Sequence, residues 1–327
     1  MRISPSRFVA GPPSGTVLLI AILIALCSFS ACGHPPQAAQ SPPPPPLQLL
    51  SQWGHSGDQP GEFQKPQVIT CDGAGSVYIA DDGNPPRIEK FDSSGRPLLV
   101  FGILSNPNDW DLAIDPGGAI FAVDRRHGWV QIFSPEGKPF RTLFFHYRRD
   151  LHDPSSIAME PEGNFYLADS VSGRIAELNP SGRASQSWSK PAGVDGHWTP
   201  YPIRLGADGN IYVGNSAERR VEKLSGDGRY LASWNFAFTA LDFSSNSPKT
   251  AGLAVSHNLV AASDSAKRLL QIWTLDGQPK LTVDFSQHPE WGAQATPTDI
   301  AFSPNGELFV LDAPDLHVLR FKVNIQP

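Results

Sequence analysis

The chain has 327 residues, 32 prolines and 29 glycines, and a formal net charge of −6. This length suits one large domain or two small ones, and the abundance of turn-forming residues favours many short strands. The acidic balance argues against nucleic-acid binding, which needs a basic surface to contact phosphates.

The first 31 residues have the organisation of a lipoprotein-type signal peptide. Arg2 and Arg7 supply the charged region, and Val17–Leu26 supplies an apolar region too short for a membrane span of about 20 residues. The tetrapeptide FSAC at positions 29–32 resembles a bacterial lipobox, which predicts lipidation of Cys32, including palmitate, after cleavage. We therefore expect a membrane-anchored lipoprotein of the cell envelope that faces the periplasm or the exterior. An ordinary signal peptide and an uncleaved anchor are the alternatives.

Residues 32–46 form a predicted tether. They include the run GHPPQAAQSPPPPP, and consecutive prolines favour polyproline II at roughly 3.1 Å per residue. The run would act as a stiff spacer of about 40 Å between the lipid and the folded domain. Proline runs also bind aromatic grooves, but beside a lipid anchor we favour the spacer.

One unit recurs from residue 47 onward, and this repeat predicts the fold. Its clearest copy opens at Pro154, continues with strands at Phe165–Asp169 and Arg174–Leu178, and ends with a fourth strand at Trp188. Alternating apolar residues give each strand a buried face, and glycine supplies the positive φ of tight turns. The second strands are expected to end, 43 to 49 residues apart, at Asp81, Asp124, Asp169, Asn215, Ser263 and Asp312. The glycine of the turn between the third and fourth strands recurs at Gly95, Gly137, Gly182, Gly228 and Gly277.

The sixth unit contains only three expected strands, which follow residue 297 and end near Val323. Residues 47–53 (LQLLSQW) match the missing fourth strand, because they end on Trp53 as other fourth strands end on Trp188 and Trp234. Small sheets of this kind must stack, and radial closure removes their exposed edges. We therefore predict an all-β protein, a six-bladed β-propeller of four-stranded antiparallel blades over residues 47–327. Its N-terminal strand closes the last blade.

The unit resembles the NHL repeat, whose pattern is an opening Pro, a strand like Gly-Asn-Ile-Tyr-Val-Ala-Asp, a short loop and Arg-Ile. Residues 154–175 match this pattern, with GNFYLAD at 163–169 and RI at 174–175. Similar segments are VYIAD at 77–81 and GNIYV at 209–213. The resemblance spans residues 47 to about 323 and implies a six-bladed propeller. In the fifth and sixth units, Ser263 and His317 replace the expected Asp and Arg.

Three polar pairs occupy the same place in different units. Catalytic sites are seldom repeated around a ring, so we interpret the pairs as structural hydrogen bonds that close the loop between the second and third strands. The pairs are Asp81 with Arg87, Asp169 with Arg174, and Asn215 with Arg220.

The strand order places the inter-blade loops and the loops between second and third strands on one face, which we call the loop-rich face. It carries the long loops 145–153, 189–199, 235–247 and 286–296 and most of the histidines. Loops held on a rigid scaffold are where binding residues accumulate. The candidate ligand-binding residues are Arg148, Arg149, His152, His197, Trp198, Tyr201, Arg204 and Trp291.

Arg204 differs from the others because it lies inside a first strand, where the other units carry Thr or Ala. It either anchors an anion in the central channel or forms a buried pair with a carboxylate such as Asp111 or Asp299. We favour the buried pair.

Two functions are compatible with these features. We favour a monomeric binding or scaffold module for a protein, peptide or envelope glycan on the loop-rich face. The alternative is a metal-assisted lyase or hydrolase, lactonase-like or lyase-like, with its site over the central channel. His152 and His197 could hold zinc with a third histidine, but no ligand spacing supports zinc or calcium, so we assign no cofactor, metal ligand or catalytic residue.

Some NHL-type propellers are enzymes, including the peptidyl-hydroxyglycine amidating lyases, whose inner strands carry metal-binding histidines. The matching positions here hold Gln67, Trp110, Ser155, Tyr201, Lys249 and Thr298, and none is His. Gluconolactonase-like and streptogramin-lyase-like propellers share the architecture, but we match none of their catalytic motifs.

Overall fold

The computed structural model describes residues 43–103, 110–145, 151–215, 217–236 and 251–325. The chain divides at Pro43, and nearly all described residues belong to the compact unit Pro44–Pro327. The predicted signal peptide, Cys32 and most of the predicted tether lie outside the described residues. No helix within the described ranges is long and apolar enough to cross a membrane.

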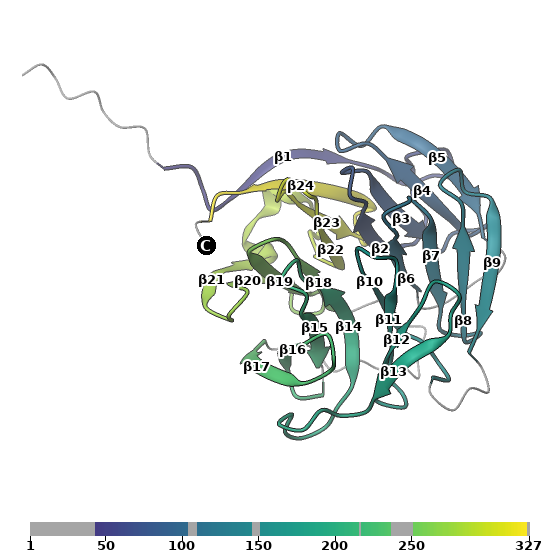
Figure 1. Cartoon of the computed structure of the whole chain (residues 1–327). Helices are drawn as coiled ribbons and strands as arrows, with labels where there is room; N and C mark the ends of the chain where they lie inside the picture. Colours follow the sequence, from purple (N-terminus) through teal and green to yellow (C-terminus); the bar gives the residue numbers. More distant parts are fainter. Residues whose placement is uncertain (1–42, 104–109, 146–150, 216, 237–250, 326–327) are drawn as a thin grey trace, which may run out of the picture. The chain divides into compact units, whose positions relative to one another are not determined.

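The described residues of this unit form six sheets of four antiparallel strands, which we number as blades 1 to 6 (Figure 1). Blade 1 contains β2 (Pro66–Cys71), β3 (Val77–Asp81), β4 (Arg87–Phe91) and β5 (Pro97–Gly102). Blade 2 contains β6 (Trp110–Ile114), β7 (Ile120–Asp124), β8 (Trp129–Phe133) and β9 (Pro139–Phe144). Blade 3 contains β10 (Ser156–Met159), β11 (Phe165–Asp169), β12 (Arg174–Leu178) and β13 (Ala184–Trp188).

Blade 4 contains β14 (Pro200–Leu205), β15 (Ile211–Asn215), β16 (Arg220–Leu224) and β17 (Tyr230–Asn235). Blade 5 contains β18 (Ala251–Val255), β19 (Leu259–Asp264), β20 (Leu269–Thr274) and β21 (Pro279–Asp284). Blade 6 contains β22 (Asp299–Phe302), β23 (Leu308–Asp312), β24 (His317–Val323) and β1 (Leu47–Trp53). Two short 3-10 helices, η1 (Phe285–Gln287) and η2 (Pro289–Trp291), lie between blades 5 and 6. The predicted all-β, six-bladed propeller is confirmed.

The N-terminal strand closes the ring as predicted. β1 pairs antiparallel with β24, from Leu47 opposite Val323 to Trp53 opposite Val318. Figure 1 shows the two strands side by side, although β1 is the first strand of the chain and β24 is the last. The Asn324 backbone N–H donates to the Pro46 carbonyl at 2.8 Å and extends the contact beyond the strands.

Blade 5 requires one correction to the predicted repeat. We expected its second strand to end at Ser263, but β19 continues to Asp264. Asp264 faces Leu269 across the ladder, in the register in which Asp81 faces Arg87 in blade 1. The acidic position of the repeat is therefore kept in blade 5. The turn that precedes β19 is one residue shorter than its counterpart in blade 1, which shifts the start of the pairing.

The core is divided among six apolar clusters, each of which lies between two neighbouring blades. For example, Ile79 of blade 1 packs with Phe309 of blade 6, whereas Tyr78 packs with Leu112 of blade 2. Successive residues of a strand point to opposite faces, so each blade buries both of its faces against its neighbours. The inner strands β2, β6, β10, β14, β18 and β22 contact one another in a closed circle.

The recurring glycine has a second role beyond its turn. Gly95 has a φ of +88°, and a Cβ added to it would lie 2.3 Å from Trp53. Gly228 has a φ of +83° and stands in the same relation to Trp188. The aromatic residue that ends one blade thus packs on the turn of the next blade, so a side chain at this glycine would both strain the turn and separate the blades.

Candidate binding site in the central channel

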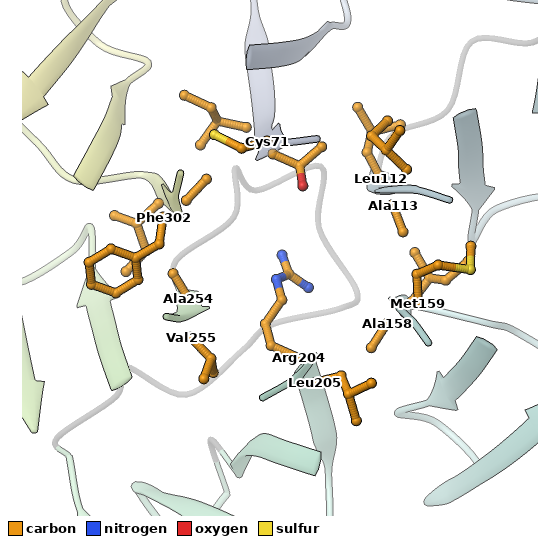
Figure 2. A pocket seen from close by; sticks show the side chains of 16 residues that line it. Cys71, Leu112, Ala113, Ala158, Met159, Arg204, Leu205, Ala254, Val255 and Phe302 are labelled. Atoms are coloured by element: carbon orange, nitrogen blue, oxygen red, sulfur yellow. The ribbon is translucent and has the colours of Figure 1, made fainter. Parts of the chain in front are cut away.

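A cavity of about 200 Å³ lies in the central channel, at the C-terminal ends of the inner strands. Figure 2 shows Arg204 extending into the space between these strands. Most of the lining residues have apolar side chains, and the polar side chains among them are those of Thr70, Cys71 and Arg204. Burial raises the pKa of the Cys71 thiol far above its ordinary value, so the thiol stays protonated.

Arg204 forms a two-pronged ion pair with Asp111 of blade 2. Its Nη1 lies 3.0 Å from Asp111 Oδ2, and its Nη2 lies 3.2 Å from Oδ1. Asp111 is fully buried, and Ser156 of blade 3 donates a short hydrogen bond to its Oδ2. This network joins three blades beneath the cavity. The structure thus shows the buried pair that we favoured from the sequence.

Asp111 and a second buried carboxylate, Asp299, also accept hydrogen bonds from the backbone of neighbouring inner strands. Asp111 Oδ2 accepts from the Ile157 backbone N–H at 3.1 Å, and Asp299 Oδ2 accepts from the Ile69 backbone N–H at 3.1 Å. Burial alone would lower the pKa of Arg204, but Asp111 and Asp299 more than offset it and raise the pKa. Asp111 pairs with the guanidinium, and the charge of Asp299 also acts on it, so Arg204 is not left as an unpaired cation that would attract an anionic guest.

The cavity lies on the opposite side of the ring from the predicted loops. Its lining residues end the first strands, next to the short turns between first and second strands. We call this side the short-turn face. Among the candidate ligand-binding residues from the sequence, Arg204 is the only one in the described ranges that lines the cavity.

The remaining candidates do not form one site. His152 and His197 are exposed, and the His197 backbone N–H and imidazole both approach Glu218, whose pKa they lower. Trp198 is partly buried against the core between blades 3 and 4. Arg148 and Arg149 lie outside the described residues.

Tyr201 and Trp291 are buried, so they are poorly placed to meet a ligand on the loop-rich face. Trp291 packs against Phe285 and Phe321, with ring centroids 4.9 and 4.8 Å away, in the core between blades 5 and 6. Its sequence position in a long loop suggested a binding role, but the loop turns this side chain inward.

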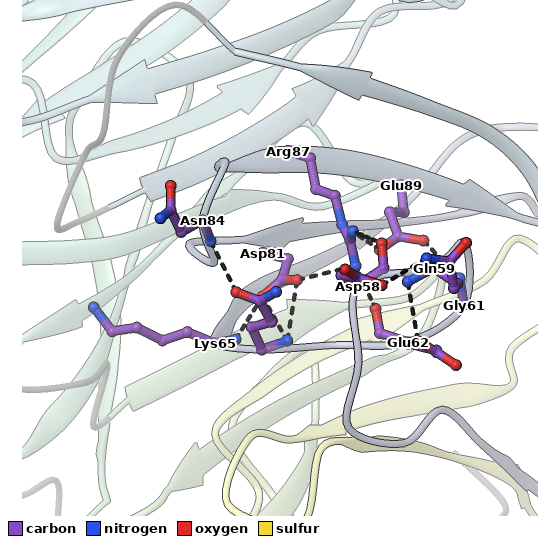
Figure 3. A network of polar contacts seen from close by, with 10 residues as sticks. Asp58, Gln59, Gly61, Glu62, Lys65, Asp81, Asn84, Arg87 and Glu89 are labelled. Atoms are coloured by element: carbon purple, nitrogen blue, oxygen red, sulfur yellow. Dashed lines mark hydrogen bonds and ion pairs between the residues drawn. The ribbon is translucent and has the colours of Figure 1, made fainter.

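The repeated polar pairs differ from blade to blade, and blade 1 has the fullest network (Figure 3). Arg87 lies 3.4 Å from Asp81 and 2.8 Å from Glu89, and it also donates to the Asp58 and Glu62 carbonyls. Burial raises the pKa of Glu89, although the Gly61 N–H and Arg87 counteract this. The network holds the inter-blade loop before β2, rather than the loop between second and third strands that we predicted.

In blade 3, no ion pair joins Asp169 and Arg174 within the described structure. Asp169 instead accepts from four backbone N–H groups, two in the inter-blade loop and two in the loop after β11. In blade 4, Asn215 and Arg220 meet through Glu222, to which both donate. The shared task is to satisfy loop backbone groups, and a direct Asp–Arg contact is not required for it.

One group of three potential metal ligands occurs among the described residues, and sequence reasoning missed it. It consists of Asp312, Asp315 and His317 in blade 6. Neither His152 nor His197 belongs to such a group in the described ranges. The signal in the sequence is Asp-x-x-Asp-x-His, which we interpreted as a degenerate copy of the Asp–Arg pair.

Comparison with known proteins supports the propeller fold. No family model and no curated protein sequence matches the chain. Similar solved structures include a streptogramin B lyase with 13% identity and a TM-score of 0.57, over 85% of this chain and 98% of that one. A catalytically inactive virginiamycin B lyase from Staphylococcus aureus with quinupristin has 11% identity and a TM-score of 0.55, over 84% and 98% of the two chains. A selenomethionine-substituted virginiamycin B lyase from the same organism has 13% identity and a TM-score of 0.53, over 86% and 90%. At these identities, the likeness shows the propeller fold alone.

Proposed function

We propose that the chain is a non-catalytic binding propeller whose partner inserts a small neutral or cationic group into the central cavity. The cavity volume of about 200 Å³ carries this proposal, because typical small-molecule sites measure about 300–1,000 Å³. A single side chain or sugar substituent suits this space better than a whole substrate. Arg204, the only charged side chain in the described lining, is already neutralised by Asp111.

We infer further that the propeller is an NHL-type domain displayed in the cell envelope on a lipidated Cys32. The repeat pattern and the FSAC tetrapeptide support this part of the proposal. Metabolic labelling with palmitate provides its test. The full-length chain should incorporate label, and Cys32→Ser should abolish incorporation; equal labelling of the two would contradict the anchor.

A metal-assisted lyase is the second candidate, since the similar solved structures include lyases. The lining of the cavity supports it less well, because it includes no His, Asp or Glu side chain among the described residues. Lyase chemistry needs a group that moves a proton, and the guanidinium of Arg204 stays protonated.

Site-specific photo-crosslinking in living cells tests the binding proposal. A photoreactive residue at Val255, in the cavity lining, should yield a defined adduct, whereas the same residue at the exposed Phe140 should not. An adduct obtained only from His197 would place the partner on the loop-rich face and overturn the proposal.

The enzyme alternative has its own assay. The purified full-length chain is incubated with quinupristin, and the mixture is followed by liquid chromatography. We expect quinupristin to remain unchanged. A new product peak that grows with time and protein concentration would establish the lyase instead.

A further inference from the structure

The loop between β23 and β24 in blade 6 gathers three potential metal ligands. Asp312, Asp315 and His317 each offer one ligand atom, and these atoms all lie within 4.8 Å of one another. We propose that the three residues bind a divalent transition-metal ion of the zinc class. Zinc is bound in proteins by this mixture of carboxylate oxygens and imidazole nitrogen.

Burial provides the second observation. His317 is 5% exposed and Asp312 is fully buried. His317 Nε2 and Asp312 Oδ2 lie 3.1 Å apart without hydrogen-bond geometry, and neither atom has a hydrogen-bond partner in the described structure. Buried polar atoms seldom remain unpaired, because each costs its full desolvation. A metal ion between the two atoms would satisfy both.

The spacing of the two atoms suits zinc. With metal–ligand bonds of about 2.0–2.1 Å in a tetrahedral site, neighbouring ligand atoms stand about 3.3 Å apart. The observed 3.1 Å is close to that edge. Calcium is less well matched, because it takes six to eight oxygen ligands and seldom an imidazole.

Two neighbouring segments hold the ligands in place. The Gln294 backbone N–H donates to Asp315 Oδ2 at 2.8 Å. Gly292 passes so close that a Cβ there would lie 2.5 Å from Asp315 Oδ2 and 3.4 Å from His317 Nε2. The glycine therefore leaves the space beside Nε2 open.

Gln52 of β1 supplies a positioning contact. In the structure Gln52 Nε2 lies 3.1 Å from His317 Nδ1, and a flip of the side-chain amide would place its oxygen there instead. In that flipped orientation the Gln52 oxygen accepts a hydrogen bond from His317 Nδ1–H, which leaves the Nε2 lone pair available to the metal. Such outer contacts fix the histidine tautomer in metal sites.

The combination of two carboxylates and one imidazole occurs in blade 6 and not at the matching positions of the other blades. At the register of His317, blades 1, 3 and 4 carry arginine, which cannot bind a metal. At the position of Asp315, three residues after the acidic position, the other blades carry Asn84, His127, Ser172, Glu218 and Lys267. Blade 6 alone carries two carboxylates and an imidazole at these three positions.

Zinc titration of the purified, EDTA-treated full-length chain by calorimetry tests the proposal. We expect one equivalent of Zn²⁺ per chain and a melting temperature that rises with zinc. His317→Arg introduces the residue that three other blades carry at this register, and it should lower zinc affinity at least about tenfold. Asp315→Asn should do the same, and Gln52→Ala should weaken binding about tenfold. His197→Arg, at an exposed histidine, is the matched control and should bind as the parent does.

Melting in EDTA keeps the test independent of folding. Without metal, His317→Arg should have a melting temperature within a few degrees of that of the parent. If His317→Arg is unstable without metal, Asp315→Asn replaces it in the zinc titration. The absence of stoichiometric zinc binding by the parent would overturn the proposal, as would unchanged binding by both ligand variants. Tighter binding of Ca²⁺ or Mg²⁺ than of Zn²⁺ would overturn the assigned class of ion.

Discussion

Blades 1 and 6 place the same strand register in different chemical settings. In blade 1, Asp81 faces Arg87, whose guanidinium reaches two carboxylates and two loop carbonyls. In blade 6, Asp312 faces His317. The buried His317 Nε2 and Asp312 Oδ2 lie 3.1 Å apart, and neither makes a hydrogen bond in the described structure. The repeat therefore fixes where these groups lie, and the identity of one side chain decides whether the position serves structure or ligand binding.

Removing the guanidinium from blade 1 should have the largest effect. Arg87→Ala leaves Glu89 and Asp81 buried without their cation, so we expect a loss of about 3–5 kcal/mol in the free energy of unfolding, measured by urea denaturation. Arg96→Ala, whose exposed side chain pairs with Asp92, is the control and should change stability by about 1 kcal/mol or less. Equal losses in the two variants would contradict the structural role of the blade 1 network.

The contact that joins the two blades comes next. Trp53 of β1 lies with its ring centroid 4.5 Å from that of Phe91 in blade 1 and packs on Gly95. Trp53→Ala should cost about 3 kcal/mol in unfolding free energy, because it opens a gap at the ring closure. Phe140→Ala removes an aromatic ring that is 71% exposed and should be nearly neutral. A neutral Trp53→Ala would show that β1 contributes little to the ring.

A third prediction places the histidine of blade 6 at the matching position of blade 1. Arg87→His keeps a contact with Asp81 in reach but loses the bonds to the Asp58 and Glu62 carbonyls, so we expect a loss of about 2 kcal/mol. Zinc should not stabilise this variant, because Asn84 stands where blade 6 has Asp315. A zinc-dependent rise in its melting temperature would show that the second carboxylate is dispensable.

Blade 5 provides the smallest effect. Asp264→Ala removes the acceptor for the Lys267 backbone N–H, 2.9 Å away, and should cost about 1 kcal/mol. Ser263→Ala should be close to neutral, because the Ser263 hydroxyl has no hydrogen-bond partner in the described structure. Thermal melts of the two variants compare them directly, and the reverse ranking would restore Ser263 as the repeat position.

The architecture was predictable because its signals are local and repeated. Alternating apolar residues, turn glycines and the aromatic end of residues 47–53 together predicted the blades and the pairing of β1 with β24. The predicted end of the second strand in blade 5 was wrong by one residue. Ser263 and Asp264 are adjacent polar residues, and the distances between repeats along the sequence do not distinguish which of them ends β19.

The candidate site was less predictable, because it depends on which way side chains turn. Asp111 was one of two expected partners of Arg204, and the structure selects it. The cavity is lined by residues such as Ile69 and Leu112, whose apolar character indicates core and not a site. Trp291 lies in a loop but packs inward, which sequence position alone does not reveal.

The pairing of β1 with β24 also bears on the order of folding. Gln52 and His317 touch across 265 positions of the chain, and contacts of such long separation form late and slowly. Blade 6 needs the first strand of the ring as well as its last three, so we expect it to be the last blade to be completed. A metal held by Asp312, Asp315 and His317, with Gln52 behind the imidazole, would consequently distinguish molecules that have finished folding from those still in progress.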